Sequence, residues 1–356
     1  MTNSYTIIGL MSGTSCDGLD IALCTFTCEN NSNWNYVLSA SKTVNYPADL
    51  EDKLKRSIQL RSEELCCLDI DFAKFMAFEV NKFTADHNLK KEDITAIASH
   101  GHTVFHQPDK GFTKQIGCGE TMAFLTGIKV INNFRQKDIS AGGQGAPLVP
   151  IGDKLLFSNK AEAFLNIGGF CNISVIQDSI IAFDICPGNL PLNKIIGRIG
   201  KEFDKNGEVA RSGVINEPLL QELNALPYYS KSAPKSLGIE WLESYFLPLL
   251  IKDITTQDLL CTITEHIAVQ IARILNDYNI DRLMISGGGT YNDYLIERLQ
   301  THYNGEVYIP DRQVIEYKEA IIFGFLGALN LAGQANCLSS VTGAKKDVTG
   351  GEIHLP

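Results

Sequence analysis

The segment Tyr5-Thr-Ile-Ile-Gly-Leu-Met-Ser-Gly-Thr-Ser-Cys-Asp-Gly-Leu-Asp-Ile-Ala-Leu-Cys-Thr-Phe26 reads as two β-strands joined by a glycine-rich turn. The residues on both sides of the turn are β-prone and carry no helical period of 3.6. A hairpin with a glycine loop differs from the strand–loop–helix of Rossmann and Walker sites, in which the glycines open a helix. The segment therefore predicts a glycine hairpin at the start of the chain.

The same pattern recurs in the second half of the chain. Ala163-Phe-Leu-Asn-Ile-Gly-Gly-Phe-Cys-Asn172, followed by residues 173–176, again reads as strand, polar glycine turn and strand. A third glycine cluster, Ser286-Gly-Gly-Gly-Thr290, instead lies between a predicted strand at 282–286 and a predicted helix at about 292–303. We interpret Thr262-Ile-Thr-Glu265 as the capping box of the helix before that strand.

The remaining segments predict an α/β fold with mixed sheets. Helical patterns at about 48–60, 63–87, 121–126, 190–203 and 317–332 alternate with strand patterns near 94–99, 128–132, 180–185 and 306–309. A length of 356 residues fits two domains. We place one at residues 1–133 plus 325–356 and the other at 134–324. The turn-rich stretch Ala141-Gly-Gly-Gln-Gly-Ala-Pro147, just after the first boundary, fits either a hinge or a ligand loop.

Composition and charge narrow the class of function. The 31 basic and 41 acidic residues give a net charge of −10, so we expect neither nucleic-acid nor membrane partners. The sequence contains no apolar run near the ~20 residues of a membrane span. The first residues resemble no secretory signal, and the ten cysteines include no C-x-x-C pair, so we expect reduced thiols in a cytoplasmic protein.

The first glycine loop, Gly13-Thr-Ser-Cys-Asp-Gly18, has the composition of a phosphate-binding turn. Successive backbone N–H groups in such a turn form a concave anion site, and the loop hydroxyls add donors. Asp17 would repel a bare phosphate, which indicates a cation, Mg²⁺, between them. A structural hairpin explains this loop equally well by itself. Two such hairpins, with a later glycine cluster against which a flat ring can lie, favour a nucleotide.

With these motifs the chain resembles the anhydro-N-acetylmuramic acid kinases, within the superfamily of actin, hexokinase and Hsp70. The blocks that carry the resemblance are Gly9–Asp20, Ser99–Val104, Arg135–Leu148, Asn166–Gly169, Phe183–Asn189, Pro234–Ser236, Ser286–Gly289, Glu319–Ala320 and Ser340–Ala344. The resemblance implies two RNase-H-like domains with mixed sheets flanked by helices around a central ATP cleft. It also implies ATP- and Mg²⁺-dependent conversion of 1,6-anhydro-N-acetylmuramic acid and water to N-acetylmuramic acid 6-phosphate in cell-wall recycling. An ordinary sugar kinase without ring cleavage, or a non-catalytic nucleotide-binding regulator, is the alternative, and a homodimer is one possible assembly.

The resemblance also assigns site residues. It makes Asp184 the catalytic base, in Asp184-Ile-Cys-Pro-Gly-Asn189 where the family has Asp-Thr-Gly-Pro-Gly-Asn. The expected ATP-binding residues, with Asp17 also facing the metal, are Gly13, Thr14, Ser15, Cys16, Asp17, Gly18, Leu19, Asp20, Asn166, Gly168, Gly169, Asn172, Ser286, Gly287, Gly288 and Gly289. The expected sugar-binding residues are His100, His102, Thr103, Arg135, Asp138, Gln144 and Glu319.

Several of these residues have a second interpretation. Asp184 fits a cap for the turn that follows it. The His100, His102 and His106 spacing also fits a zinc site. Arg135 and Asp138 are spaced to form an i,i+3 salt bridge. Glu319 would be stabilised at a helix start whatever its function.

Overall fold

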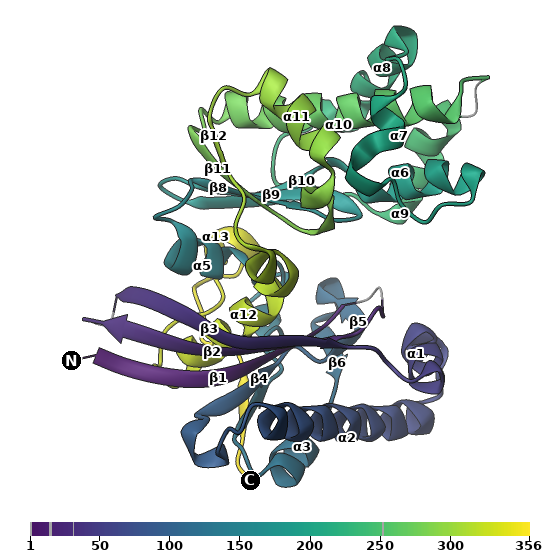
Figure 1. The fold of residues 1–356 in the computed structure, drawn as a ribbon. Helices are drawn as coiled ribbons and strands as arrows, with labels where there is room; N and C mark the ends of the chain where they lie inside the picture. The colour runs from purple at the N-terminus through teal and green to yellow at the C-terminus, as the bar shows by residue number, and fades with distance from the viewer. Residues whose placement is uncertain (1, 14–15, 31, 251–252) are drawn as a thin grey trace. The chain divides into compact units, whose positions relative to one another are not determined.

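The computed structural model describes residues 2–13, 16–30, 32–250 and 253–356. The chain forms two compact units (Figure 1): residues 1–157 with 317–356, and residues 158–316. These divisions differ from the expected boundaries at 133/134 and 324/325. At the first boundary the difference arises because the glycine-rich stretch is fixed within the first unit, where the Gln144 N–H donates to the Thr342 carbonyl at 2.8 Å.

The first unit is built on a six-stranded sheet in the order β13-β7-β4-β1-β2-β3. Strands β1 to β3 run antiparallel, β4 and β7 run parallel to β1, and β13 closes the edge antiparallel to β7. The strands are β1 (Thr2–Ser12), β2 (Leu19–Glu29), β3 (Asn33–Val44), β4 (Ala96–Ser99), β7 (Val130–Asn132) and β13 (Glu352–His354). A separate hairpin contains β5 (His102–Gln107) and β6 (Phe112–Ile116).

Helices cover both faces of this sheet (Figure 1). The helices are α1 (Ala48–Lys55), α2 (Ser62–Asp86), α3 (Gly119–Thr126), α4 (Gln136–Ser140), α5 (Pro150–Gly152), α12 (Arg312–Leu331) and α13 (Ser339–Thr342). On one face Ile8 of β1 shares a buried core with Phe72 of α2. On the other face α12 lies so close to β1 that a Cβ at Gly9 would be 1.9 Å from the Ala320 carbonyl oxygen. Glycine at position 9 therefore sets the close approach of α12.

The second unit repeats the same strand order in a five-stranded sheet, β10-β9-β8-β11-β12. Its strands are β8 (Ala163–Ile167), β9 (Phe170–Ile176), β10 (Ile180–Pro187), β11 (Arg282–Ser286) and β12 (Glu306–Tyr308). The first three run antiparallel, and β11 and β12 run parallel to β8. Both units thus have three antiparallel strands followed by two parallel ones, which is RNase-H-like, and the predicted α/β class with mixed sheets is confirmed.

The helices of the second unit pack on its sheet through α10, whose Ile263, Ile267 and Ile271 are fully buried. They are α6 (Asn189–Ile196), α7 (Glu208–Arg211), α8 (Glu217–Asn224), α9 (Ile239–Trp241), α10 (Thr256–Asp277) and α11 (Asp293–His302). The interpretation of residues 262–265 as a capping box is wrong. The α10 helix begins earlier, where the Thr255 side chain accepts from the Asp258 N–H.

Single turns of 3₁₀ or π helix complete both units. They are Ser57–Gln59, Lys91–Asp93, Pro108–Lys110, Asp153–Phe157, Gly197–Ile199, Lys205–Gly207, Pro227–Ser230, Leu242–Phe246, Leu247–Leu250 and Gly288–Tyr291. Among the helices that the structure describes, none combines the length and apolar character needed to cross a membrane.

Candidate active site

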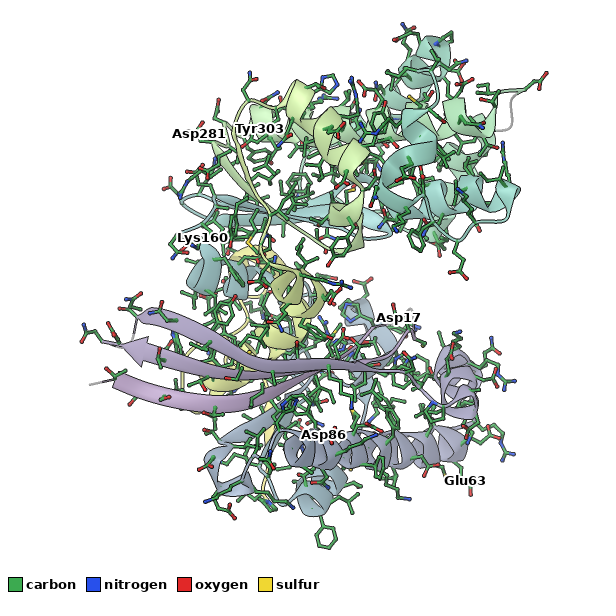
Figure 2. All side chains as sticks on the ribbon, in the orientation of Figure 1. Asp17, Glu63, Asp86, Lys160, Asp281 and Tyr303 are labelled. Atoms are coloured by element: carbon green, nitrogen blue, oxygen red, sulfur yellow. The ribbon has the colours of Figure 1, made fainter. Side chains whose placement is uncertain are left out.

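The first glycine loop closes the β1–β2 hairpin, whose pairing extends to Ser12 opposite Leu19. This confirms the hairpin predicted from the sequence. Cys16 adopts the left-handed conformation (φ 58°), and its N–H donates to the Gly13 carbonyl at 3.2 Å. Asp17 is exposed at the tip of the hairpin, at the end of the sheet away from the N-terminus (Figure 2). Thr14 and Ser15, also expected at the phosphates, lie outside the described residues.

A tyrosine that the sequence analysis missed holds the two ends of this loop together. The Tyr46 hydroxyl lies 2.9 Å from Ser12 Oγ and 2.8 Å from the Gly18 carbonyl oxygen. Burial raises the pKa of Tyr46, so its hydroxyl stays a donor at neutral pH. Ser12 Oγ is also 3.2 Å from Nδ1 of His102, whose ring is buried. The loop is therefore connected to one of the predicted sugar-binding histidines.

His100 and Arg135 form the centre of the predicted sugar cluster. Nε2 of His100 accepts from Arg135 at 2.9 Å, and its Nδ1 lies 2.8 Å from the Gly101 carbonyl oxygen. Burial and the Arg135 charge lower the pKa of His100 to about 3, so the ring is neutral. These bonds assign its proton to Nδ1. Arg135 also donates to the Gly145 carbonyl at 2.9 Å, which ties the glycine-rich stretch to residues 100–101.

Asp138 is fully buried and holds the glycine-rich stretch 141–147 in place through hydrogen bonds. Its Oδ2 accepts from the Gly145 N–H at 2.8 Å, and its Oδ1 accepts from the Thr342 hydroxyl at 2.7 Å. Arg135 and Asp138 thus bind other partners rather than forming the salt bridge considered from their spacing. The Gln144 side chain is exposed. Asp138 therefore positions the glycine-rich stretch, whereas the Gln144 side chain is accessible to a ligand.

Glu319 lies inside α12, two turns after the helix begins at Arg312, so the helix-start interpretation of this residue is wrong. Glu319 is exposed to solvent, yet the protein packed around it raises the pKa of its carboxyl, and the carboxylates of Asp20 and Asp17 add to this effect. Arg135 opposes the rise. Asp20 accepts from the Thr43 hydroxyl at 2.6 Å. The Asp17 and Asp20 carboxylates therefore contribute to the electrostatic environment of Glu319.

The zinc interpretation of the three histidines does not match their geometry. His106 Nδ1 is 3.2 Å from the Thr113 hydroxyl, whereas His100 and His102 face Arg135 and Ser12. In the described part of the chain, no three His, Cys, Asp or Glu side chains are placed to hold a metal ion. Next to His102, the Thr103 hydroxyl accepts from the Gln115 amide at 3.2 Å.

The second and third glycine clusters lie side by side in the sheet of the second unit. Gly168 and Gly169 close the β8–β9 hairpin, where Asn166 is opposite Asn172. On its other side Asn166 is in register with Ser286 of β11.

The third cluster needs its glycines for close contact and for its backbone conformation. Gly287 has φ 85°, and a Cβ there would be 2.5 Å from Asn166 Oδ1. At Gly289 a Cβ would be 2.1 Å from Ile167 Cγ2. At Gly288 the nearest atom to such a Cβ is 3.9 Å away, so its backbone is open. The open backbone at Gly288 is compatible with the flat ring expected from the sequence.

The second hairpin is also tied to the start of α6. The N–H groups of Gly188 and Asn189 donate to the carbonyls of Gly169 and Gly168, both at 2.8 Å. The backbone N–H groups of the turn that ends β10 therefore have their hydrogen-bond partners in the second hairpin. Asp184 is not its cap.

Asp184 lies on β10 opposite Asn172, next to a β-bulge. Its Oδ2 accepts from the Leu237 N–H at 2.8 Å, and its backbone N–H donates to the Lys235 carbonyl at 3.0 Å. The Tyr228 hydroxyl donates to the Asp184 carbonyl at 2.6 Å. Burial raises the pKa of Asp184, against the effect of the Leu237 N–H. A half-buried carboxylate held in one orientation is suited to accept a proton.

The two residues after Asp184 depart from the motif that the chain resembles. Ile185 and Cys186 are buried in the core of the second unit. Cys186 faces Cys171 across the β9–β10 pair. Both side chains therefore pack in the core. The Asp184 carboxylate receives its hydrogen bond from the Leu237 N–H instead.

Comparison with known proteins gives full-length matches. The family model described as anhydro-N-acetylmuramic acid kinase matches residues 5–356. A protein of that name from Francisella tularensis subsp. novicida is 36% identical over 98% of this chain and 98% of its own length. One from Shewanella putrefaciens is 38% identical over 99% of each chain. Among solved structures, a ROK hexokinase from Thermus thermophilus matches 92% of this chain and 99% of its own, with 12% identity and a TM-score of 0.40.

Proposed function

The chain belongs to the anhydro-N-acetylmuramic acid kinase family, and from this membership we propose that it phosphorylates 1,6-anhydro-N-acetylmuramic acid with ATP. Water opens the anhydro ring, and the products are N-acetylmuramic acid 6-phosphate and ADP. The reaction serves cell-wall recycling in the cytoplasm. The single observation that carries the proposal, beyond the family, is the oriented Asp184 carboxylate beside the second glycine hairpin. A homodimer stays a prediction.

Asp184 is the general base of the proposed reaction. It removes a proton from the water whose oxygen forms a bond to the anomeric carbon, while the bond from that carbon to O6 breaks. O6 bonds to the γ-phosphorus, and the bond to the ADP oxygen breaks. An inverting glycosidase needs a carboxylic acid to protonate its leaving oxygen. Here phosphoryl transfer to O6 replaces that acid, so one carboxylate suffices.

Two glycine hairpins are the proposed binding elements for the ATP phosphates. The first is Gly13–Gly18 and the second is Gly168–Gly169. The backbone of Ser286–Gly289 binds the adenosine, which is supported by the open position of Gly288. Mg²⁺ prefers carboxylate, phosphate and water ligands, and the exposed Asp17 carboxylate beside the first loop is the residue that would hold it together with the ATP phosphates. When bound, the ion neutralises charge on the transferred phosphoryl group.

The sugar is proposed to bind to the first unit through His100, His102, Thr103, Arg135, Gln144 and Glu319. Arg135 pairs with the lactyl carboxylate, because a guanidinium binds a carboxylate through two parallel hydrogen bonds. The neutral His100 positions that guanidinium. We assign Asp138 a positioning role, since both of its carboxylate oxygens already accept protein hydrogen bonds.

Incubation with ATP, Mg²⁺ and the anhydro sugar in ¹⁸O-labelled water tests the proposal. Label at the anomeric oxygen of a 6-phosphorylated product is the expected result. Phosphorylated sugar with an intact anhydro ring would instead identify an ordinary sugar kinase. Nucleotide binding without any phosphorylated sugar would identify a regulator.

A further inference from the structure

The second unit contains a cavity of about 320 Å³ that the proposed reaction does not use. It is lined by Phe183 of β10, by residues 229–235 and by the C-terminal turn of α10 with Tyr278. Because neighbouring side chains on a strand point to opposite faces, Phe183 and Asp184 project to opposite sides of β10. The cavity therefore lies behind the proposed base.

Positive charge dominates the lining of this cavity. Lys231, Lys235 and Arg273 face a single carboxylate, Asp277. Arg273 Nε is 3.8 Å from Asp277 Oδ2, and both side chains are exposed, so this pair is weak. Burial lowers the pKa of Lys235, and the charges of Arg273 and Lys231 lower it further. The lining thus carries excess positive charge in a chain whose net charge is −10.

The rest of the lining offers an aromatic wall and hydroxyl groups. The rings of Phe183 and Tyr278 lie 5.9 Å apart between centroids. Nζ of Lys235 is 5.9 Å from the Phe183 centroid and 4.8 Å from that of Tyr228, which holds the ammonium over the rings. Ser230 and Ser232 also line the cavity. The cavity therefore offers charged and hydroxyl groups to an anionic group of a ligand, and aromatic rings to the carbon skeleton attached to it.

We propose that this cavity binds a phosphate monoester of a small organic molecule. The charge of a phosphate monoester at neutral pH matches the excess positive charge of the lining. Its three terminal oxygens match ammonium, guanidinium and hydroxyl donors. The carbon part of the ester packs against Phe183 and Tyr278. The binding is independent of the proposed function, although the proposed product is itself a phosphate monoester.

The segment after the cavity connects it to the proposed base. The side chain of Lys235 lines the cavity, and its carbonyl accepts from the Asp184 N–H at 3.0 Å. Two residues later the Leu237 N–H donates to the Asp184 carboxylate at 2.8 Å. A ligand that binds the Lys235 side chain therefore shifts the segment that orients Asp184. Binding of this ligand to the cavity changes kcat. This coupling rests on the proposed function.

Isothermal titration calorimetry of the full chain with phenyl phosphate, without ATP or sugar, tests the binding. We expect binding by the wild type that becomes roughly tenfold weaker or more in the Lys231→Gln/Arg273→Gln double variant, which loses charge-assisted hydrogen bonds. Lys201→Gln removes an exposed lysine of the same unit and should bind like the wild type. Circular dichroism checks the fold of each variant.

Three outcomes would overturn the site. They are absence of binding by the wild type, equal affinity in the double variant, or inorganic phosphate binding as tightly as phenyl phosphate, which would leave the aromatic wall without a role. None of these depends on turnover, so failure of the proposed reaction is a separate result.

Steady-state rates at saturating ATP and sugar test the coupling. We expect phenyl phosphate to change kcat in the wild type and in Lys201→Gln, with no change in the double variant. A constant kcat at concentrations where calorimetry shows the cavity occupied would overturn the coupling.

Discussion

Replacing Asp184 by Asn removes the proposed base while keeping an oxygen that can accept from the Leu237 N–H, now 2.8 Å from the carboxylate. The bonds to the Asp184 backbone from Tyr228 and to the Lys235 carbonyl are unaffected. We therefore expect the fold and ATP binding to survive. Loss of a general base costs about 10²–10⁴-fold in kcat. This corresponds to about 2.7–5.4 kcal/mol of transition-state stabilisation at about 1.36 kcal/mol per factor of ten.

The assay is ADP release at saturating ATP and anhydro sugar, with calorimetry for ATP binding. Asp178→Asn is the matched control, because Asp178 is exposed in the turn between β9 and β10 of the same hairpin. A kcat of Asp184→Asn equal to that of the control would refute the role of Asp184.

The pH profile gives a second readout for the same residue. A general base works only when deprotonated, and burial raises the pKa of Asp184. Activity should therefore fall with decreasing pH beginning above the range of a free aspartate, whose pKa is about 3.9. The residual rate of Asp184→Asn should lack this acid limb, and persistence of the limb would assign it to another group.

Four further substitutions test the packing of both units and two site residues of the first unit. Gly9→Ala places a methyl group against the Ala320 carbonyl and should destabilise by about 1–3 kcal/mol in calorimetric unfolding. Gly197→Ala, with open space and helical φ, should stabilise by about 0.4–1 kcal/mol, and equal effects would contradict this packing argument. Asp138→Asn loses one of two buried acceptors and should cost about 1–3 kcal/mol with a higher sugar KM; an unchanged KM would leave it no positioning role. Asp17→Asn should raise the Mg²⁺ concentration needed for half-maximal rate, and an unchanged requirement would reduce Asp17 to a turn residue.

The features that sequence could predict are local. The two glycine hairpins were identified because strand, turn and strand are contiguous, and the observed pairing of Ser12 with Leu19 and Asn166 with Asn172 follows from that. The helix after the third cluster, expected at about 292–303, occupies Asp293–His302. The family resemblance supplied what these patterns lack, namely the identity of the sugar and the proposed role of Asp184.

The residues that sequence missed act across long separations. Tyr46 contacts Ser12 from 34 residues away, and Leu237 contacts Asp184 from 53. Thr342 reaches Asp138 from 204 residues away. Nothing in the local pattern around Tyr46 or Leu237 marks such a contact, because the sheet and loop pairings that create it are not encoded at either position alone.

The misplaced start of α10 has a different cause. Thr262 and Glu265 have the spacing of a capping box, but Thr255 and Asp258 provide the real cap seven residues earlier. Glu265 instead binds Arg298 at 2.6 Å in the middle of the helix. The spacing of Thr262 and Glu265 therefore matched a cap, although Glu265 serves a tertiary ion pair.

The return of the chain to the first unit sets an order for its synthesis. Residues 158–316 contain all of the second unit, so that unit has every strand it needs before the chain is finished. The first unit does not: the face of β1 at Gly9 and the edge of β7 stay uncovered until α12 and β13 leave the ribosome. The N-terminal strands are made first and completed last. During translation their apolar surface and free strand edge stay exposed for longest, which favours aggregation.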